Sequence, residues 1–309
     1  MELRFEKMHG LGNDFVVVDG TSDLFAERED SNWRTSLVDK LTESACAICN
    51  RRFGIGADGL ILVLPSATAD FKMHYVNSDG SISPMCGNGV RCVGKFVFDH
   101  GLWDKESLAL ETGSGILHLD LTIHKSKVSA VKVSMGTPSF DAASLPAIFP
   151  DGSKNLIEKS LSAGGEKLIA TCLSVGNPHC VTFLDEGLSV DDYPVYRVGK
   201  AIENATDVFP ERVNVEFAKM RGNDSIDLRV WERGCGETLA CGSGACATVA
   251  AAVATGRVAP GAEVAVRLPG GILNISWSGN AGDSILMSGP AVSVYSGFFD
   301  PDAFSASRS

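Results

Sequence analysis

Two stretches of equal length decide the fold: MCGNGVRCVGKFVFDHG at residues 85–101 and ACGSGACATVAAAVATG at residues 240–256. Each carries Cys-Gly-X-Gly near its start and ends in glycine after a run of small and apolar residues, which predicts a helix beginning close to the cysteine. A strand-like segment precedes each motif, and these segments close at Asn77 and Glu232, nine residues before Cys86 and Cys241. The chain therefore contains the same structural unit twice.

A third match extends the repeat towards the start of each half. GNDFVVVD at residues 12–19 resembles GNPHCVTFLD at residues 176–185. Three matches in the same order indicate two homologous α/β halves related by pseudo-twofold symmetry, and a chain of 309 residues is long enough for two cores. We expect an N-terminal half made of residues 1–130 plus 288–309 and a C-terminal half made of residues 131–287.

Alternation and periodicity predict the elements of the first half. Strands are expected at 3–7, 15–19, 60–64 and 71–77, and helices at 33–50 and 89–100. Residues 107–135 and 264–295 are rich in strand patterns with glycine turns.

Composition excludes several classes of protein. Hydrophobic residues make up 44% of the chain and charged residues 21%, which is typical of a globular protein. The net charge of -11 and the pI near 5.0 argue against nucleic acid or an anionic membrane as partner. The longest apolar runs have the length of strands, and MELRFEKMHGLGNDF has neither a signal-peptide nor a transit-peptide pattern. We expect a cytoplasmic protein without a membrane span.

The nine cysteines are an odd set and a poor disulfide framework, so we expect reduced thiols. A Cys-X-X-Cys pair, Cys46 and Cys49, falls on a predicted helix without the glycine or proline of a redox motif. We expect it to pack in the core. No second Cys-X-X-Cys or suitably spaced histidine pair accompanies it, so no metal is expected.

Cysteine before Gly-X-Gly at a helix start has a specific chemistry. The unpaired amides and the positive end of the helix dipole lie next to the sulfur and should lower the pKa of the thiol. The glycines let a ligand approach the backbone, and the same amides can bind a carboxylate. Cys86 and Cys241 form a matched pair of this kind. Two opposed thiols suit inversion at a carbon, whereas a cysteine protease needs one nucleophile with its base.

Six motifs occur in a fixed order along nearly the whole chain: KMHGLGNDF, FGIGADG, NSDGSISPMCGNGVR, SVGNPH, RVNVEF and ERGCGETLACGSGACA. This set resembles the diaminopimelate epimerase family. The resemblance implies an α/β (α+β) fold of two similar domains, each a curved sheet around a central helix, with the active site in the cleft between them. It implies interconversion of LL- and meso-diaminopimelate, in lysine biosynthesis, with no cofactor and without pyridoxal phosphate. We also expect a homodimer.

The resemblance also implies roles for individual residues. Cys86 and Cys241 are the catalytic bases, and His179 and Glu232 tune the sulfurs or hold the reacting ammonium. Arg233 is the clamp for the distal carboxylate of the substrate. The other implied substrate contacts are Asn13, Asn77, Gly87, Asn88, Asn177, Asn214, Gly242 and Ser243.

One position departs from the family pattern, because many members carry glutamine where this chain has Gly59. This departure bears on the substrate more than on the reaction. A racemase of another amino acid, such as histidine or proline, would keep both cysteines but lack the distal clamp. Arg233, Asn77 and Asn214 favour diaminopimelate. A non-catalytic thiol or metal-binding protein that uses Cys46 and the remaining cysteines is the alternative from another class, and it leaves the two helix starts unexplained.

Overall fold

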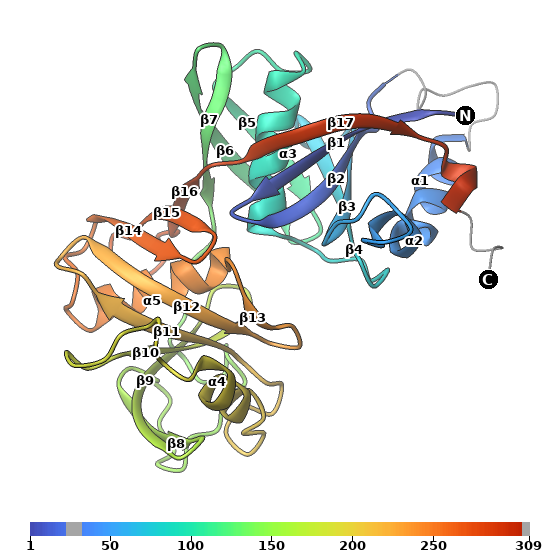
Figure 1. Ribbon diagram of the computed structural model, residues 1–309. Coiled ribbons are helices and arrows are strands. Elements are labelled where there is room, and N and C mark those ends of the chain that lie inside the picture. Colours follow the sequence, from blue (N-terminus) through green and yellow to red (C-terminus); the bar gives the residue numbers. More distant parts are fainter. Residues whose placement is uncertain (23–32, 305–309) are drawn as a thin grey trace. The chain divides into compact units, whose positions relative to one another are not determined.

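The computed structural model describes residues 1–22 and 33–304 (Figure 1). The chain divides into two compact units: unit 1 is Met1–Val133 with Pro290–Ser309, and unit 2 is Ser134–Gly289. Each unit is a mixed sheet with helices on its faces. Among the described residues, no helix is long and apolar enough to cross a membrane.

The sheet of unit 1 begins with the last strand of the chain. In spatial order its strands are β17 (Val292–Phe299), β1 (Leu3–Gly10), β2 (Asn13–Asp19), β3 (Gly59–Leu64), β4 (Phe71–Asn77), β5 (Ser107–Thr112), β6 (Gly115–His124) and β7 (Lys127–Ser134). The β2–β3 and β4–β5 pairs are parallel and the other pairs are antiparallel. The helices of this unit are α1 (Trp33–Glu43), α2 (Ala45–Cys49) and α3 (Gly87–Asp99).

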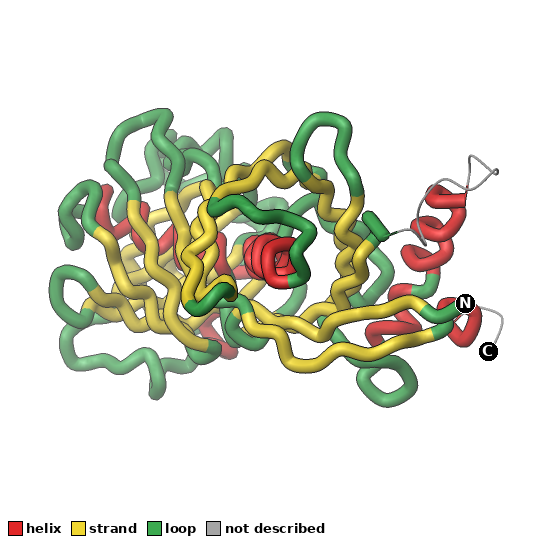
Figure 2. Tube along the Cα trace, turned by 90° about the horizontal axis from the view of Figure 1, so that it is seen from above, coloured by secondary structure: helices red, strands yellow, loops and turns green. Residues whose placement is uncertain are grey.

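Helix α3 is the central helix of unit 1, and Figure 2 looks along it as strands surround it. It lies close to the sheet because Gly89 has no side chain: a Cβ there would stand 2.9 Å from Ile61 Cδ1 and 3.7 Å from Phe15 Cζ. Alternate residues of β2 and β3, such as Val16 and Leu60, belong to a second cluster that packs with α1 and α2. The near-continuous apolar run of β3 follows from this burial on both faces.

Unit 2 repeats the same order of pairings. Its strands are β8 (Lys159–Ala163), β9 (Glu166–Ser174), β10 (Pro178–Phe183), β11 (Asn214–Met220), β12 (Ser225–Glu232), β14 (Glu263–Leu268), β15 (Gly271–Ser276) and β16 (Leu286–Gly289), and the short β13 (Gly236–Thr238) pairs with β12. Here β10–β11 and β12–β14 are the parallel pairs. The helices are α4 (Val195–Glu203) and α5 (Gly242–Ala254).

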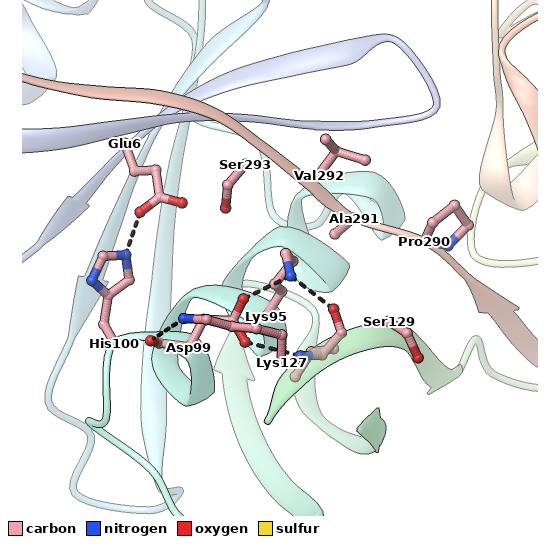
Figure 3. A pocket seen from close by; sticks show the side chains of 11 residues that line it. Glu6, Lys95, Asp99, His100, Lys127, Ser129, Pro290, Ala291, Val292 and Ser293 are labelled. Carbon is pink, nitrogen blue, oxygen red and sulfur yellow. Dashed lines mark hydrogen bonds and ion pairs between the residues drawn. The ribbon is translucent and has the colours of Figure 1, made fainter. Parts of the chain in front are cut away.

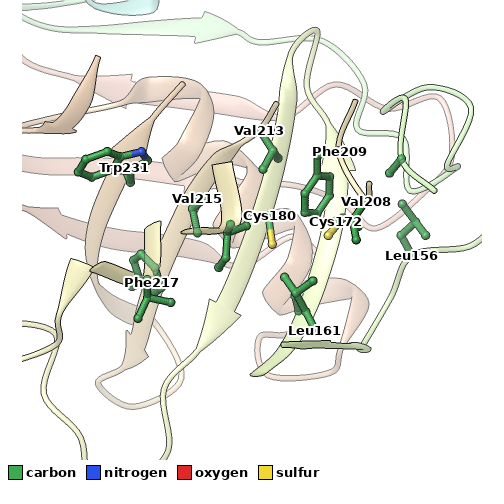
Figure 4. Packing of buried hydrophobic residues seen from close by; sticks show 14 of the residues in the cluster. Leu156, Leu161, Cys172, Cys180, Val208, Phe209, Val213, Val215, Phe217 and Trp231 are labelled. Atoms are coloured by element: carbon green, nitrogen blue, oxygen red, sulfur yellow. The ribbon is translucent and has the colours of Figure 1, made fainter. Parts of the chain in front are cut away.

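Helix α5 is the central helix of unit 2 and is buried almost throughout. The other face of the sheet packs with α4 over a core that includes Phe209, Phe217 and Trp231 (Figure 4). Helix α4 approaches this core at Gly199, where a Cβ would stand 2.6 Å from Trp231 Cβ. Both units therefore bury their sheet between a central helix and a second layer.

The expected α/β fold, with a sheet around a central helix in each half, is confirmed. The prediction of one continuous helix at 33–50 is wrong, because α1 ends at Glu43 and α2 begins at Ala45. The Thr42 hydroxyl donates to the Val38 carbonyl at 2.8 Å just before this break, a side-chain bond that bends helices. Asn50 is extended and does not continue α2.

The fold predicts that a single methyl group at Gly199 destabilises unit 2. In Gly199→Ala the new Cβ meets the Trp231 side chain, and overpacking of a core typically costs about 1–3 kcal/mol, more than the helix propensity that alanine gains. Chemical denaturation measures this loss. The control is Gly187→Ala, whose Cβ has open space and whose stability should stay within about 0.5 kcal/mol of the parent. Equal stabilities for the two variants would contradict the packing described.

Candidate active site

Cys86 is the N-cap of α3 and is half-buried. Its backbone is extended, with φ −143° and ψ 113°, and its carbonyl accepts the first helical bond from Val90 N at 2.9 Å. The thiol donates to Asn13 Oδ1 at 3.6 Å, and Asn88 Nδ2 donates to the same oxygen at 3.2 Å. In unit 1 the structure thus brings together three predicted site residues, namely Cys86, Asn13 and Asn88.

The amide of Asn13 is held in one orientation by acidic residues. Its Nδ2 donates to Asp58 Oδ2 at 2.8 Å, and Arg51 binds both Asp14, at 2.6 Å, and Asp58, at 2.7 Å. Burial raises the pKa of Asp14, but its bonds to Arg51 and Lys7 outweigh burial and hold that pKa below its usual range. The Asp14 carboxylate therefore stays ionised, and Asn13 Oδ1 is left to face the sulfur.

Arg91 supports the turn that follows Cys86, a role that was not predicted from the sequence. Its side chain is fully buried, and Nη2 donates to Asn88 Oδ1 at 2.8 Å while Nη1 donates to the Gly87 carbonyl at 3.2 Å. A third bond runs from Nε to the Pro290 carbonyl at 3.2 Å. The available signal was an arginine between the apolar residues Val90 and Cys92 near the start of the helix.

Cys241 occupies the matching place in unit 2, as the N-cap of α5. Its φ of −120° and ψ of 111° are again extended, and Ala245 N donates to its carbonyl at 3.0 Å. Unlike Cys86 it is buried, with 5% exposure, and its sulfur lies 3.6 Å from Ser243 Oγ. The two cysteines share a backbone geometry but differ in their access to water.

The expected lowering of the thiol pKa is wrong for Cys241. Burial raises the pKa of Cys241 well above its ordinary value, and the carboxylates of Glu232 and Glu216 raise it further. Hydrogen bonds from Ser243 and the Gly244 amide act in the opposite direction but do not compensate. In this form of the protein Cys241 is a thiol and not a thiolate.

His179 is fully buried and belongs to a hydrogen-bonded chain that reaches Ser243, next to Cys241. Its Nδ1 is 2.7 Å from Glu216 Oε1 and its Nε2 is 2.9 Å from Asn177 Oδ1. Asn177 Nδ2 in turn donates to Ser243 Oγ at 3.3 Å. The structure therefore brings the predicted site residues His179, Asn177 and Ser243 together, and it adds Glu216, which no sequence motif indicated.

Three further predicted residues of unit 2 lie around the turn after β12. Asn214 bonds only to backbone in the contacts described: Nδ2 donates to the Pro178 carbonyl at 2.8 Å, and Oδ1 accepts from Arg233 N at 2.9 Å. The Arg233 side chain is exposed and donates to the Glu211 carbonyl at 3.0 Å. Glu232 accepts a hydrogen bond from the Thr238 hydroxyl. Asn214 thus holds the turn that presents Arg233.

Asn77 and Gly59 are partners across the β3–β4 pair. Asn77 Nδ2 donates to Ser81 Oγ at 2.9 Å. A Cβ at Gly59 would stand 2.4 Å from Tyr75 Cε2 and 2.7 Å from the Val76 carbonyl oxygen. The Tyr75 ring therefore fills the space that a longer side chain at position 59 would need.

Three other cysteines, Cys46, Cys49 and Cys92, do not occupy the N-cap positions of α3 and α5. Cys92 is fully buried in α3, and burial raises its pKa to about 12. Cys49 is buried as expected, with its pKa raised to about 12 mainly by burial, whereas Cys46 is exposed and does not belong to the core. Within residues 1–22 and 33–304, no group of three potential metal-binding side chains is present.

A cavity of about 540 Å³ lies at the far end of α3, and none of the predicted site residues lines it (Figure 3). Two ion pairs lie in its walls, Lys95 with Asp99 at 2.6 Å and His100 with Glu6. Lys127 adds one positive charge and donates to the Asp99 carbonyl at 3.0 Å, so the charges of the walls sum to zero when the histidine is neutral.

Comparisons with known proteins agree with the duplicated motif. The sequence profile of the family described as diaminopimelate epimerase matches residues 5–140 and 171–294. The chain is 44% identical to diaminopimelate epimerase of Leptospira biflexa over 298 residues, which cover 96% of this chain and 99% of that protein. It is 41% identical to diaminopimelate epimerase of Methanococcus maripaludis, over 96% of this chain and 100% of that protein.

Solved structures support the fold. A hydroxyproline epimerase from Agrobacterium vitis matches with a TM-score of 0.66 and 15% identity, over 98% of this chain and 95% of that one. A probable proline racemase from Agrobacterium radiobacter matches with a TM-score of 0.68 and 16% identity, over 98% of this chain and 96% of that one. The family profile and the two sequence relatives show that this chain belongs to the diaminopimelate epimerase family.

Proposed function

We propose that this chain is an isomerase that interconverts LL- and meso-2,6-diaminopimelate without pyridoxal phosphate, using Cys86 and Cys241 as its acid/base pair. One observation carries the proposal. In a member of the diaminopimelate epimerase family, the two cysteines occupy the same N-cap position in two halves that repeat one order of strand pairings.

The reaction is a proton exchange at the α-carbon. The thiolate of one cysteine removes the α-proton, and the electron pair of the broken C–H bond is delocalised towards the α-carboxylate. The thiol of the other cysteine then delivers its proton to the opposite face, which inverts the centre and exchanges the protonation states of the two sulfurs. Backbone amides at the starts of α3 and α5 are proposed to hold the carboxylate as charge develops on it. They belong to Gly87, Asn88, Gly242 and Ser243.

The buried groups around Cys241 define its part in this exchange. Because burial keeps Cys241 protonated, it is proposed as the proton donor in the half-reaction in which Cys86 has first lost its proton and acts as the base. Glu232 and His179 are proposed to hold the reacting ammonium and tune the sulfur. After one turnover the roles of the thiols are reversed.

Recognition of the distal end is proposed to depend on Arg233 and on amide side chains. The planar guanidinium of Arg233 suits bidentate binding of a carboxylate, and its exposure leaves most of its donors available to a ligand. The amides proposed to contact substrate are Asn13, Asn77 and Asn177, while Asn214 contributes by fixing the turn that carries Arg233. A substrate without the distal ammonium and carboxylate would leave these groups unpaired.

The proposal includes the setting of the enzyme. The reaction belongs to lysine biosynthesis, and a cytoplasmic location is consistent with cysteines that are all free thiols. A homodimer is supported by strand β17, which pairs with β1 and exposes apolar side chains at Val292, Val294 and Phe298. Such an exposed strand is a template for association.

The homodimer is tested by a charge on β17. Val294 is 56% exposed, so Val294→Asp should leave the monomer folded while it weakens an apolar interface. Light scattering across a dilution series should give a dimer for the parent and a monomer for the variant. A monomeric parent would refute the proposed assembly.

The reaction is tested by α-hydrogen exchange. LL-diaminopimelate in deuterated water, with purified enzyme and no added cofactor, should gain deuterium at the α-carbon as the meso isomer forms. Mass spectrometry and chiral chromatography measure the two events together. Exchange with proline or histidine in place of diaminopimelate would identify the alternative, a racemase of another amino acid.

Loss of either thiol should abolish inversion, because each sulfur serves one face of the α-carbon. Cys86→Ala and Cys241→Ala are therefore expected to lose at least about 100-fold in rate, the lower end of what a positioned acid or base contributes. The matched control is Cys235→Ala, an exposed cysteine close in sequence to Cys241, which should keep the parent rate. Full activity in either of the first two variants would refute the two-base assignment.

Position 59 should resist the glutamine that many family members carry. In Gly59→Gln the Cβ would collide with the Tyr75 ring and the Val76 carbonyl, so we expect destabilisation by roughly 1–3 kcal/mol and no gain in activity. Thermal unfolding and the exchange assay measure the two effects. A stable variant with a lower KM would show that the space is available.

A further inference from the structure

The two cysteines lie above different side chains at equivalent places in the two sheets. When the register of the parallel pair β2–β3 is aligned with that of β10–β11, Phe15 takes the position equivalent to His179. In the same alignment, Ile61 takes the position equivalent to Glu216. All four side chains are fully buried. Unit 1 therefore holds an apolar pair where unit 2 holds an ionisable pair.

The fold itself does not require the ionisable pair. Phe15 and Ile61 support α3 in the same position, at the glycine of the first helical turn. A buried ion pair or its neutral form contributes little net stability compared with apolar residues of similar volume. Glu216 Oε2 also has no hydrogen-bond partner, which adds to the cost of burying this carboxyl group. A role in the chemistry of Cys241 accounts for a pair that packing alone would not favour.

Glu216 contacts both His179 and the start of α5. Its Oε1 lies 2.7 Å from His179 Nδ1, and a Cβ placed on Gly244 would stand 2.8 Å from the same oxygen. From His179 the bonds continue through Asn177 to Ser243, whose hydroxyl is 3.6 Å from the Cys241 sulfur. One hydrogen-bonded chain thus joins Glu216 to the reacting thiol.

The direction of the bonds in this chain follows from burial. A pair without access to water favours zero net charge, and burial raises the pKa of Glu216, with Glu232 raising it further and His179 opposing them. Zero net charge is met by an imidazolium with a carboxylate, or by a neutral imidazole whose Nδ1 accepts a hydrogen bond from the carboxylic acid. Both arrangements leave a proton on Nε2.

The proton on Nε2 determines the orientation of the Asn177 amide and of the Ser243 hydroxyl. It is donated to Asn177 Oδ1, so the amide nitrogen of Asn177 is turned towards Ser243 Oγ. Because Ser243 accepts that bond, its own hydroxyl proton is available for a hydrogen bond to the Cys241 sulfur. A hydrogen bond donated to the sulfur favours the thiolate, which the return half-reaction needs.

We propose that Glu216 is a positioning residue that fixes the tautomer and ring orientation of His179, and through Asn177 the direction of the hydrogen bond that Ser243 gives to Cys241. This inference rests on the proposed function for its kinetic consequences. A carboxylate that orients a histidine through its second ring nitrogen is a common arrangement in enzymes and metal sites.

The kinetic test compares two substitutions of similar size. Glu216→Leu keeps the volume but cannot bond to Nδ1, so kcat should fall on the order of 10–100-fold, the usual effect of removing such a partner, while KM changes much less. Glu216→Gln can donate its amide to Nδ1 and keep the proton on Nε2, so it should recover most of the loss. Parent-like kcat in Glu216→Leu, or no recovery in Glu216→Gln, would overturn the assignment.

Nitrogen-15 NMR of His179 tests the tautomer without turnover. The parent and Glu216→Gln should show Nε2 protonated, and Glu216→Leu should show a mixture of tautomers or ring orientations. A parent with an unprotonated Nε2 would refute the proposal. Since this spectrum requires no substrate, it stays decisive if the chain proves not to be a diaminopimelate epimerase.

The control removes a buried polar group from β10, the strand that carries His179, because Glu216 itself lies on β11. Thr182 lies on β10, and its buried hydroxyl has no partner, so Thr182→Val should keep the parent kcat and the parent His179 spectrum. Thermal unfolding establishes that Glu216→Leu is folded. A loss of kcat in Thr182→Val equal to that in Glu216→Leu would show that packing in β10, and not the bond to His179, is responsible.

Discussion

The attachment of a cysteine to the first turn of a buried helix is the constraint on which each unit depends. The sulfur can stand beside the helical amides only if the residue is the N-cap, and the N-cap is fixed in space only because strands hold the helix on its sides. In unit 1 the turn is further held by Arg91 through Asn88 and Gly87. The same burial excludes water from the thiol and raises its pKa. At Cys241, the packing that positions the sulfur therefore also makes the thiol a weaker acid.

The repeat made the cysteine positions predictable from the sequence. Periodicity and glycine placement indicated two helix starts, and equal spacing from Asn77 and Glu232 selected Cys86 and Cys241 among nine cysteines. Glu216 could not be found in this way, because a carboxylate within an alternating strand is more often exposed, and its partner His179 is 37 residues away on a parallel neighbour. The acidity of Cys241 was predicted with the wrong sign because burial is a property of the tertiary structure.

Duplication has preserved the backbone of the two halves more closely than the chemistry around each sulfur. Both follow one order of parallel and antiparallel pairings, and both place glycine with a positive φ before the asparagine of the repeat, 88° at Gly12 and 83° at Gly176. The thiol of unit 1 donates to an amide oxygen above apolar residues. The thiol of unit 2 lies above an acid and an imidazole. The two halves share one architecture and differ in the groups that surround each sulfur.

Strand β17 completes the sheet of unit 1 although it is made last, while every residue of unit 2 lies within one uninterrupted segment. During synthesis on the ribosome, unit 2 can therefore reach its full set of strand pairings before unit 1 has its final strand. The N-terminal residues of β1 must wait for a partner that is translated almost 300 residues later. A released chain truncated before β17 would hold a finished C-terminal unit and an open N-terminal sheet, a form exposed to chaperones and proteases.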